Sequence, residues 1–216
     1  MLAKGHKGLT AWHYAAWNGT KEILETLWGW GREVQLNLRD DQLLAREHEG
    51  LTAWQYAVKY RKKEILQTLW VWGREVQVDL INDLLLSKGF DGLTAWDRAS
   101  FLGNKEILEV LWCWGREVQL NLKNDLLLAR GYGGLTAWDR ATDKGNKEIL
   151  ETLWGWGREV QVNLKNDLLA KGLDGLTAWN RAAFHGYKEI LETLWGWGRE
   201  LEINLKNDLL PVKRYN

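Results

Sequence analysis

The sequence has very little proline and cysteine, and its charges balance. A single proline, Pro211, favours helix, because proline removes a backbone hydrogen-bond donor wherever it occurs. The single cysteine, Cys113, excludes an internal disulfide framework and is typical of a reducing compartment, so we expect a cytoplasmic protein. The 29 basic and 29 acidic residues leave no net basic charge for nucleic acid. No run of 18 apolar residues is present, so we expect no membrane partner.

Tryptophan is abundant, and it marks a repeat. The chain has 16 tryptophans, and the segment Gly-Leu-Thr-Ala-Trp occurs five times, with successive offsets of 42, 42, 42 and 41 residues. The shorter spacing arises in the fourth copy, which has one leucine fewer after Asp167 than the third has after Asp125. We therefore expect one repeat domain over residues 1–216, with repeats at approximately 8–49, 50–91, 92–133, 134–174 and 175–216.

Each repeat predicts two helices and a third, shorter one. Thr10 is a suitable N-cap for a short first helix that ends near Gly19. The second helix begins near Thr20 and runs to Val34, and its apolar positions cover more than one face. Asn37 and its equivalents can cap the third helix, although its leucine run is also compatible with an extended buried segment. Because such short helices cannot bury their apolar faces alone, adjacent repeats must stack into an all-α solenoid.

The segment from Gly8 to Trp28 resembles the ankyrin repeat, a family whose unit is about 33 residues long. The matching positions are Thr10, Ala15, Ala16, Gly19, Glu22, Ile23 and Leu27. Alanine and tryptophan replace the family's Pro-Leu pair, the repeat is longer, and the usual hairpin segment is absent. The resemblance implies five stacked ankyrin-like helix-turn-helix units, each with an additional short helix. Stacking of the armadillo or HEAT type remains a structural alternative.

Comparison of equivalent positions, which we call columns, separates constant from variable parts. The second-helix block is nearly identical in all five repeats, whereas the first helix and the loop before it vary. In ankyrin folds these variable parts line the concave recognition face, so the resemblance implies a protein or peptide partner there. Aromatic residues in these columns are typical of interface anchors. The candidate partner-binding residues are Trp17, Asn18, Tyr56, Tyr60, Arg98, Phe101, Leu102, Asp139, Arg140, Lys144, Arg181, Phe184 and His185.

The constant motifs favour structural roles. Residues two apart on a helix, such as Trp28 and Trp30, point to nearly opposite sides, so we expect their rings to fill seams within and between repeats. The constant glycine that follows, Gly31 in the first repeat, indicates a close approach that leaves no room for a Cβ atom. Cys113 shares its column with glycines and Val71, which predicts a packed thiol rather than a nucleophile.

No metal-ligand spacing, nucleophile–base pair or phosphate-binding loop is present in the sequence, so we expect no cofactor, no metal site and no enzyme activity. Two alternatives to a protein-binding scaffold stay open. The near-identical copies also fit a purely structural or engineered consensus-like array, and an aromatic groove could bind a small molecule. The ends carry no obvious polar capping repeat, which indicates either a piece of a longer array or end-to-end self-association.

Overall fold

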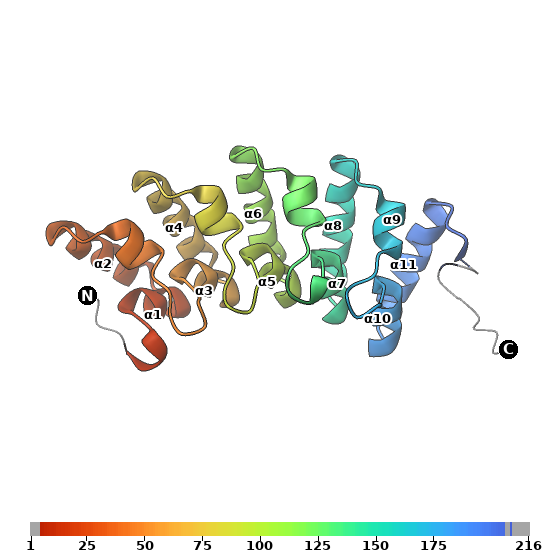
Figure 1. Cartoon of the computed structure of the whole chain (residues 1–216), viewed down its shortest axis with the longest axis horizontal. Helices are drawn as coiled ribbons and strands as arrows, with labels where there is room; N and C mark the ends of the chain where they lie inside the picture. The colour runs from red at the N-terminus through yellow and green to blue at the C-terminus, as the bar shows by residue number, and fades with distance from the viewer. Residues whose placement is uncertain (1–4, 206–207, 209–216) are drawn as a thin grey trace. The chain divides into compact units, whose positions relative to one another are not determined.

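The computed structural model describes residues 5–205 and Asp208, and every regular element within these residues is a helix (Figure 1). The predicted fold class, an all-α helical-repeat solenoid, is confirmed. The chain divides into two compact units. Unit 1 comprises Met1–Ala99 and Glu106–Leu120, and unit 2 comprises Ser100–Lys105 and Asn121–Asn216, so the boundary falls within the third repeat.

Each repeat contains a short first helix followed by a second helix of 13 residues. The first helices are α1 (Ala11–Asn18), α3 (Ala53–Lys59), α5 (Ala95–Leu102), α7 (Ala137–Asp143) and α10 (Ala178–His185). The second helices are α2 (Lys21–Glu33), α4 (Lys63–Glu75), α6 (Lys105–Glu117), α8 (Lys147–Glu159) and α11 (Lys188–Glu200). Single 3-10 turns, η1 (His6–Gly8) and η5 (Tyr132–Gly134), precede two of the first helices.

A third, six-residue helix follows each of the first four second helices, as the sequence predicts. The helices are η2 (Leu38–Leu43), η3 (Leu80–Leu85), η4 (Leu122–Leu127) and α9 (Leu164–Leu169). Side-chain oxygens of Asn37, Asp79, Asn121 and Asn163 accept backbone N–H groups at their starts, which confirms the predicted caps. The equivalent stretch of the fifth repeat lies mostly outside the described residues.

The third helices differ in type because the repeats differ by one leucine. In η3 and η4 the closing hydrogen bonds join residues five apart, from Leu86 N–H to the Ile81 carbonyl (2.8 Å) and from Leu128 N–H to the Lys123 carbonyl (2.9 Å). This is the π-helical pattern, which accommodates one extra residue in a helical turn. The fourth repeat lacks that residue, and its α9 is an ordinary α-helix. The absent leucine is therefore absorbed within the third helix, and the second helix keeps its length.

Tryptophan rings fill the contact between neighbouring repeats, as predicted. In unit 1, α1 lies beside α3 and α2 beside α4 (Figure 1). Trp28 of the first repeat stacks on Trp72 of the second, with ring centroids 4.5 Å apart. The edge of Trp12 meets both rings, with centroid distances of 5.9 Å and 5.7 Å. The same arrangement recurs in unit 2 between Trp154 and Trp197, at 4.2 Å.

The constant glycine of the second helix faces the third helix. A Cβ atom on Gly157 would lie 2.7 Å from a methyl carbon of Leu164, and one on Gly73 would lie 3.1 Å from Leu84. The predicted close approach is therefore confirmed, and the nearest atoms include side chains of the third helix. The column two positions earlier, which contains Gly155 and Cys113, faces outward, and a Cβ atom on Gly155 would meet open space. The prediction of a packed Cys113 is wrong, because this thiol lies in that outward column and is exposed.

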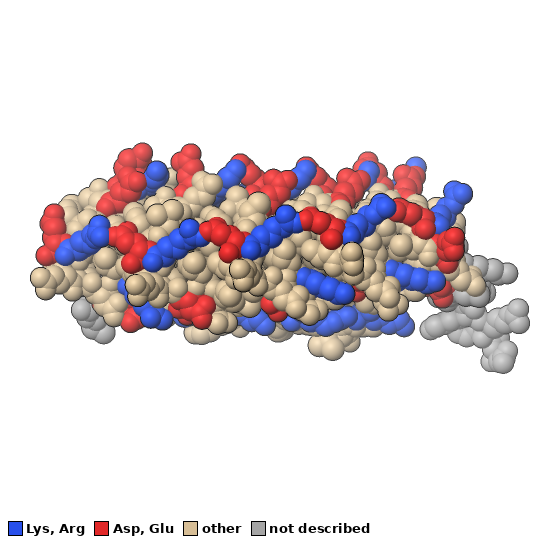
Figure 2. Space-filling view, turned by 90° about the horizontal axis from the view of Figure 1, so that it is seen from above, with Lys and Arg blue, Asp and Glu red and all other residues tan. Residues whose placement is uncertain are grey.

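Ion pairs connect successive second helices near both of their ends. Arg32 pairs with Glu75 and Arg74 with Glu117, while Lys63 Nζ lies 2.6 Å from Glu106 Oε1. In unit 2 Arg158 pairs with Glu200 at 2.9 Å. Figure 2 shows basic and acidic side chains alternating in rows on this surface. In each pair the cation belongs to the earlier repeat and the acid to the later one. The two sides of a repeat therefore carry opposite charges at this contact.

Candidate partner-binding surface

The first-helix columns that vary in sequence are only partly exposed. Exposed candidates are Trp17, Asn18, Phe101, Lys144, Phe184 and His185, and Tyr60 and Leu102 are intermediate. Five further candidates are buried: Tyr56, Arg98, Asp139, Arg140 and Arg181. The variable columns therefore do not all lie on one accessible surface, and the buried positions require a separate explanation.

Asp139 belongs to a capping column rather than to an exposed surface. Its carboxylate accepts the N–H of Thr136 at 2.9 Å, and its own N–H donates to the threonine hydroxyl at 3.4 Å, which forms a capping box. The equivalent residues His13, Gln55, Asp97 and Asn180 accept the same threonine N–H at 2.9–3.2 Å. The column varies in residue type but keeps one hydrogen-bond acceptor, so its variation is compatible with an entirely structural role.

The buried arginines hold the loop before the first helix. Arg98 Nη2 lies 2.6 Å from Asp91, and Arg140 Nη2 donates to the Tyr132 carbonyl at 2.9 Å. Arg181 is 4% exposed and contacts three carboxylates, those of Asp139, Asp143 and Asp174. These arginines are therefore buried beneath the surface, where their charged groups hold the loops in place. Tyr56 is likewise 6% exposed, and its burial raises the pKa of its phenol to about 12.

Five of the predicted residues meet in one groove of unit 2. A cavity of 370 Å³ is lined by Phe101 at the end of α5, by Lys144 after α7 and by Phe184 and His185 of α10, with Arg181 below. The remaining lining residues are Asp143, Asp174 and Leu176. Ligand pockets generally occupy about 300–1,000 Å³, so this groove is at the small end of that range. It can accept a short segment with one or two side chains.

The Phe101 wall of the groove is held in place by polar contacts. Lys144 Nζ lies 4.4 Å above the ring centroid of Phe101, and the Asn146 amide donates to the carbonyls of Ser100 and Phe101 at 3.1 Å. The ring of Phe184 contacts His185 edge-on at 5.0 Å. Phe184 itself is 81% exposed, which leaves a large apolar surface in water.

The charges of the groove are largely balanced. Burial opposes the charge of Arg181, but the hydrogen bonds that it donates to Asp143 and Asp174 outweigh this effect and raise the pKa of the guanidinium. The carboxyl of Asp174 is partly desolvated, yet hydrogen bonds from Leu176 and Arg181 lower its pKa. The neighbouring Asp139 is more deeply buried, and the loss of solvation raises its pKa. The paired groups shape the groove, which leaves Lys144 and the phenyl rings to contact a ligand.

A row of aromatic rings forms a second candidate surface in unit 1. Trp17 stacks on Tyr60 at 5.2 Å and on Tyr14 at 6.2 Å, and Tyr60 lies 5.8 Å from Tyr56. Lys59 Nζ lies within 5.8 Å of both Tyr56 and Tyr60. Sequence reasoning did not select Tyr14 or Lys59. Column position could have identified both residues, because Tyr14 shares the column of Tyr56, and Lys59 shares that of Trp17.

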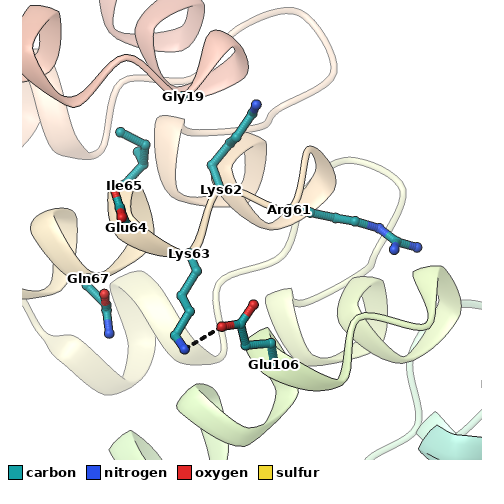
Figure 3. A pocket seen from close by; sticks show the side chains of 8 residues that line it. All are labelled: Gly19, Arg61, Lys62, Lys63, Glu64, Ile65, Gln67 and Glu106. Atoms are coloured by element: carbon teal, nitrogen blue, oxygen red, sulfur yellow. Dashed lines mark hydrogen bonds and ion pairs between the residues drawn. The ribbon is translucent and has the colours of Figure 1, made fainter.

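A cavity of 480 Å³ in unit 1 has basic walls, but its basic side chains do not point toward a common point (Figure 3). It lies at the turn between α3 and α4 and is lined by Arg61, Lys62 and Lys63 with Glu106. Figure 3 shows these three basic side chains pointing in different directions, and Lys63 reaching Glu106. We therefore do not assign a ligand to this cavity.

No group of three or more His, Cys, Asp or Glu side chains suited to a metal ion occurs in the described part of the chain. Within the same residues, no helix has both the length and the apolar character needed to cross a membrane. No protein-family model matches the sequence, and comparison with curated proteins finds no significant relative.

Proposed function

We propose that the chain is a non-catalytic, ankyrin-like scaffold that binds a protein or peptide segment along its first helices. One observation carries this proposal: exposed aromatic and basic side chains from α5, from the residue after α7 and from α10 border the groove around Phe101, Lys144 and Phe184. Aromatic side chains on rigid helices are effective anchors, because they bury a large area at a small cost in side-chain entropy. The exposed thiol of Cys113 is compatible with the cytoplasm that we propose as its location.

The groove favours a partner segment with an apolar side chain. Phe101 and Phe184 can enclose such a side chain, while Lys144 is available for a carboxylate or a backbone carbonyl of the segment. A small-molecule ligand is less well supported, because the groove is small and its buried charges are already paired.

An array without a dedicated ligand is the second candidate. It is supported by the nearly identical second helices, whose contacts recur from repeat to repeat, as at Trp28–Trp72 and Trp154–Trp197. Peptide display against the whole chain separates the two candidates. The scaffold proposal expects enriched sequences with a common apolar anchor, whereas the array alternative expects no enrichment.

The decisive comparison uses a selected, fluorescently labelled peptide and two double variants. Phe101→Ala with Phe184→Ala should weaken binding at least about tenfold, because hot-spot truncations cost 2 kcal/mol or more. The control is Val34→Ala with Val71→Ala. It removes two exposed apolar side chains, one at the end of α2 and one in α4, and should leave the affinity for the peptide unchanged. Equal binding to both variants would rule out this groove.

A further inference from the structure

The outer face of the first repeat exposes side chains that other repeats bury. Ile23 is 51% exposed, whereas the equivalent Ile65 is 1% exposed; Trp30 is 60% exposed, whereas Trp72 is 9% exposed. A 260 Å³ cavity, lined mainly by apolar surface, lies between Trp12 and Trp30. We call this surface the leading face. It has the composition of an internal contact between repeats.

The opposite face of the fifth repeat exposes the complementary side chains. Ala183 is exposed and Leu191 and Trp195 are partly exposed, although the equivalent residues of the first repeat are buried. Leu24 is fully buried there, and Trp28 is 5% exposed. We call this surface the trailing face.

Inside each unit, the trailing side of one repeat packs on the leading side of the next. The recurring feature is a parallel tryptophan stack, with centroids 4.2–4.5 Å apart and planes within 10° of parallel. The three stacks are Trp28–Trp72, Trp70–Trp114 and Trp154–Trp197. By position, the trailing-face equivalent of Trp28 is Trp195, and the leading-face equivalent of Trp72 is Trp30.

The charges of the two faces are also complementary. The leading face carries Glu22 and Glu33, in the columns that accept Lys63 and Arg74 inside unit 1, as Glu106 and Glu117 do. The trailing face carries Lys188 and Arg199, in the columns that supply those cations. Among the residues described, no ion pair is recorded for Glu22, Glu33 or Arg199, and Lys188 contacts only Glu192 of its own helix, at 3.5 Å.

We propose that the trailing face of one copy binds the leading face of a second copy, with Trp195 stacked on Trp30. Lys188 and Arg199 then pair with Glu22 and Glu33, as cations and acids do between repeats within a unit. This contact joins two different surfaces, so each added copy leaves one leading and one trailing face free. The expected assembly grows beyond a dimer as the concentration increases.

Charge reversal tests the contact in the whole chain by sedimentation velocity over a range of concentrations. The wild-type mass should rise with concentration beyond that of a dimer. Glu22→Lys with Glu33→Arg makes both faces basic, and Lys188→Glu with Arg199→Glu makes both acidic. Each double variant alone should associate at least about tenfold more weakly, because like charges then face each other.

Mixing the two double variants tests the proposed charge pairing most directly. Each face then meets an opposite charge on the other variant, so the mixture should recover concentration-dependent association. Lys88→Glu with Lys165→Glu makes the same change in net charge as Lys188→Glu with Arg199→Glu, at exposed sites outside both faces, and should associate as the wild type does. A wild type that stays monomeric, one that stops at a dimer, or a mixture that does not recover association would each overturn the proposal.

Discussion

The indole ring of Trp28 lies parallel to that of Trp72, with an interplanar angle of 2° and centroids 4.5 Å apart. The two residues are separated by one repeat in sequence and come from neighbouring second helices. This stack, bordered by the edge of Trp12, fills the centre of the contact between the first two repeats. Constant tryptophans therefore account for the cohesion of these two repeats.

Trp72→Ala should lower the free energy of unfolding by about 3–5 kcal/mol, because it removes a buried ring and leaves a cavity between two repeats. Trp30→Ala is the matched control, since Trp30 occupies the same column but is exposed in the first repeat. Its cost should stay within about 0.5 kcal/mol. Urea unfolding of dilute protein measures both. Equal losses would contradict a structural role for the stack.

Two glycines of α8 should respond oppositely to alanine. Gly155→Ala should stabilise the chain by up to about 1 kcal/mol, because its Cβ meets open space and alanine favours helix. Gly157→Ala should destabilise it, since the new Cβ would lie 2.7 Å from Leu164 Cδ2 and displace α9. Thermal unfolding of the two variants provides the comparison. A stabilised Gly157→Ala would show that α9 moves without cost.

Arg61 adopts a left-handed conformation, with φ of 59°, at the position where the other repeats have glycine. A side chain in this region costs about 1–2 kcal/mol. Arg61→Gly should therefore raise the free energy of unfolding by about 0.5–1 kcal/mol, after allowing for the flexibility of glycine in the unfolded chain. The reciprocal Gly186→Arg should lower it, because Gly186 has φ of 72° and no neighbour that would otherwise clash. Chemical denaturation that ranks the two variants in the reverse order would contradict this assignment.

Titration of Asp139 should lower the free energy of unfolding as the pH rises. Burial raises the pKa of its carboxyl above the ordinary value, so the folded chain binds the proton more tightly than the unfolded chain. Stability is then lost as the pH rises through the interval between the two values. Asp139→Asn removes this titration and should keep the cap, because Asn180 occupies the same column and makes the same hydrogen bond. Urea unfolding between about pH 4 and pH 7 should show that the free energy of unfolding falls less with pH in the variant than in the wild type. Parallel curves for the two proteins would contradict a contribution from Asp139.

Much of the fold could be predicted, because the features that determine it recur along the sequence. Thr10 and Asn37 have equivalents at the same place in later repeats, and each begins a helix as expected. The π-helical turns could not be foreseen, since they depend on how one extra leucine fits against the second helix. The prediction of a packed Cys113 was wrong because glycine in that column indicates open space rather than crowding.

The candidate surface was harder to predict because sequence variation does not by itself indicate exposure. Phe101, Lys144 and Phe184 do meet in a groove, whereas Asp139 and Arg181 vary under structural constraint. The capping column keeps a hydrogen-bond acceptor, and this shared chemistry could have separated it from freely variable positions. Arg98 and Arg181 pair with acids in the preceding loops, and those contacts become evident only when the loops are placed in space.

The most direct test of the proposed function is to map where a display-selected peptide binds, using backbone amide NMR of the whole chain. Binding along the first helices predicts the largest chemical-shift changes at Phe101, Lys144, Phe184 and His185, with small changes in the second helix α8. Changes confined to α8 or to other second helices would contradict the account.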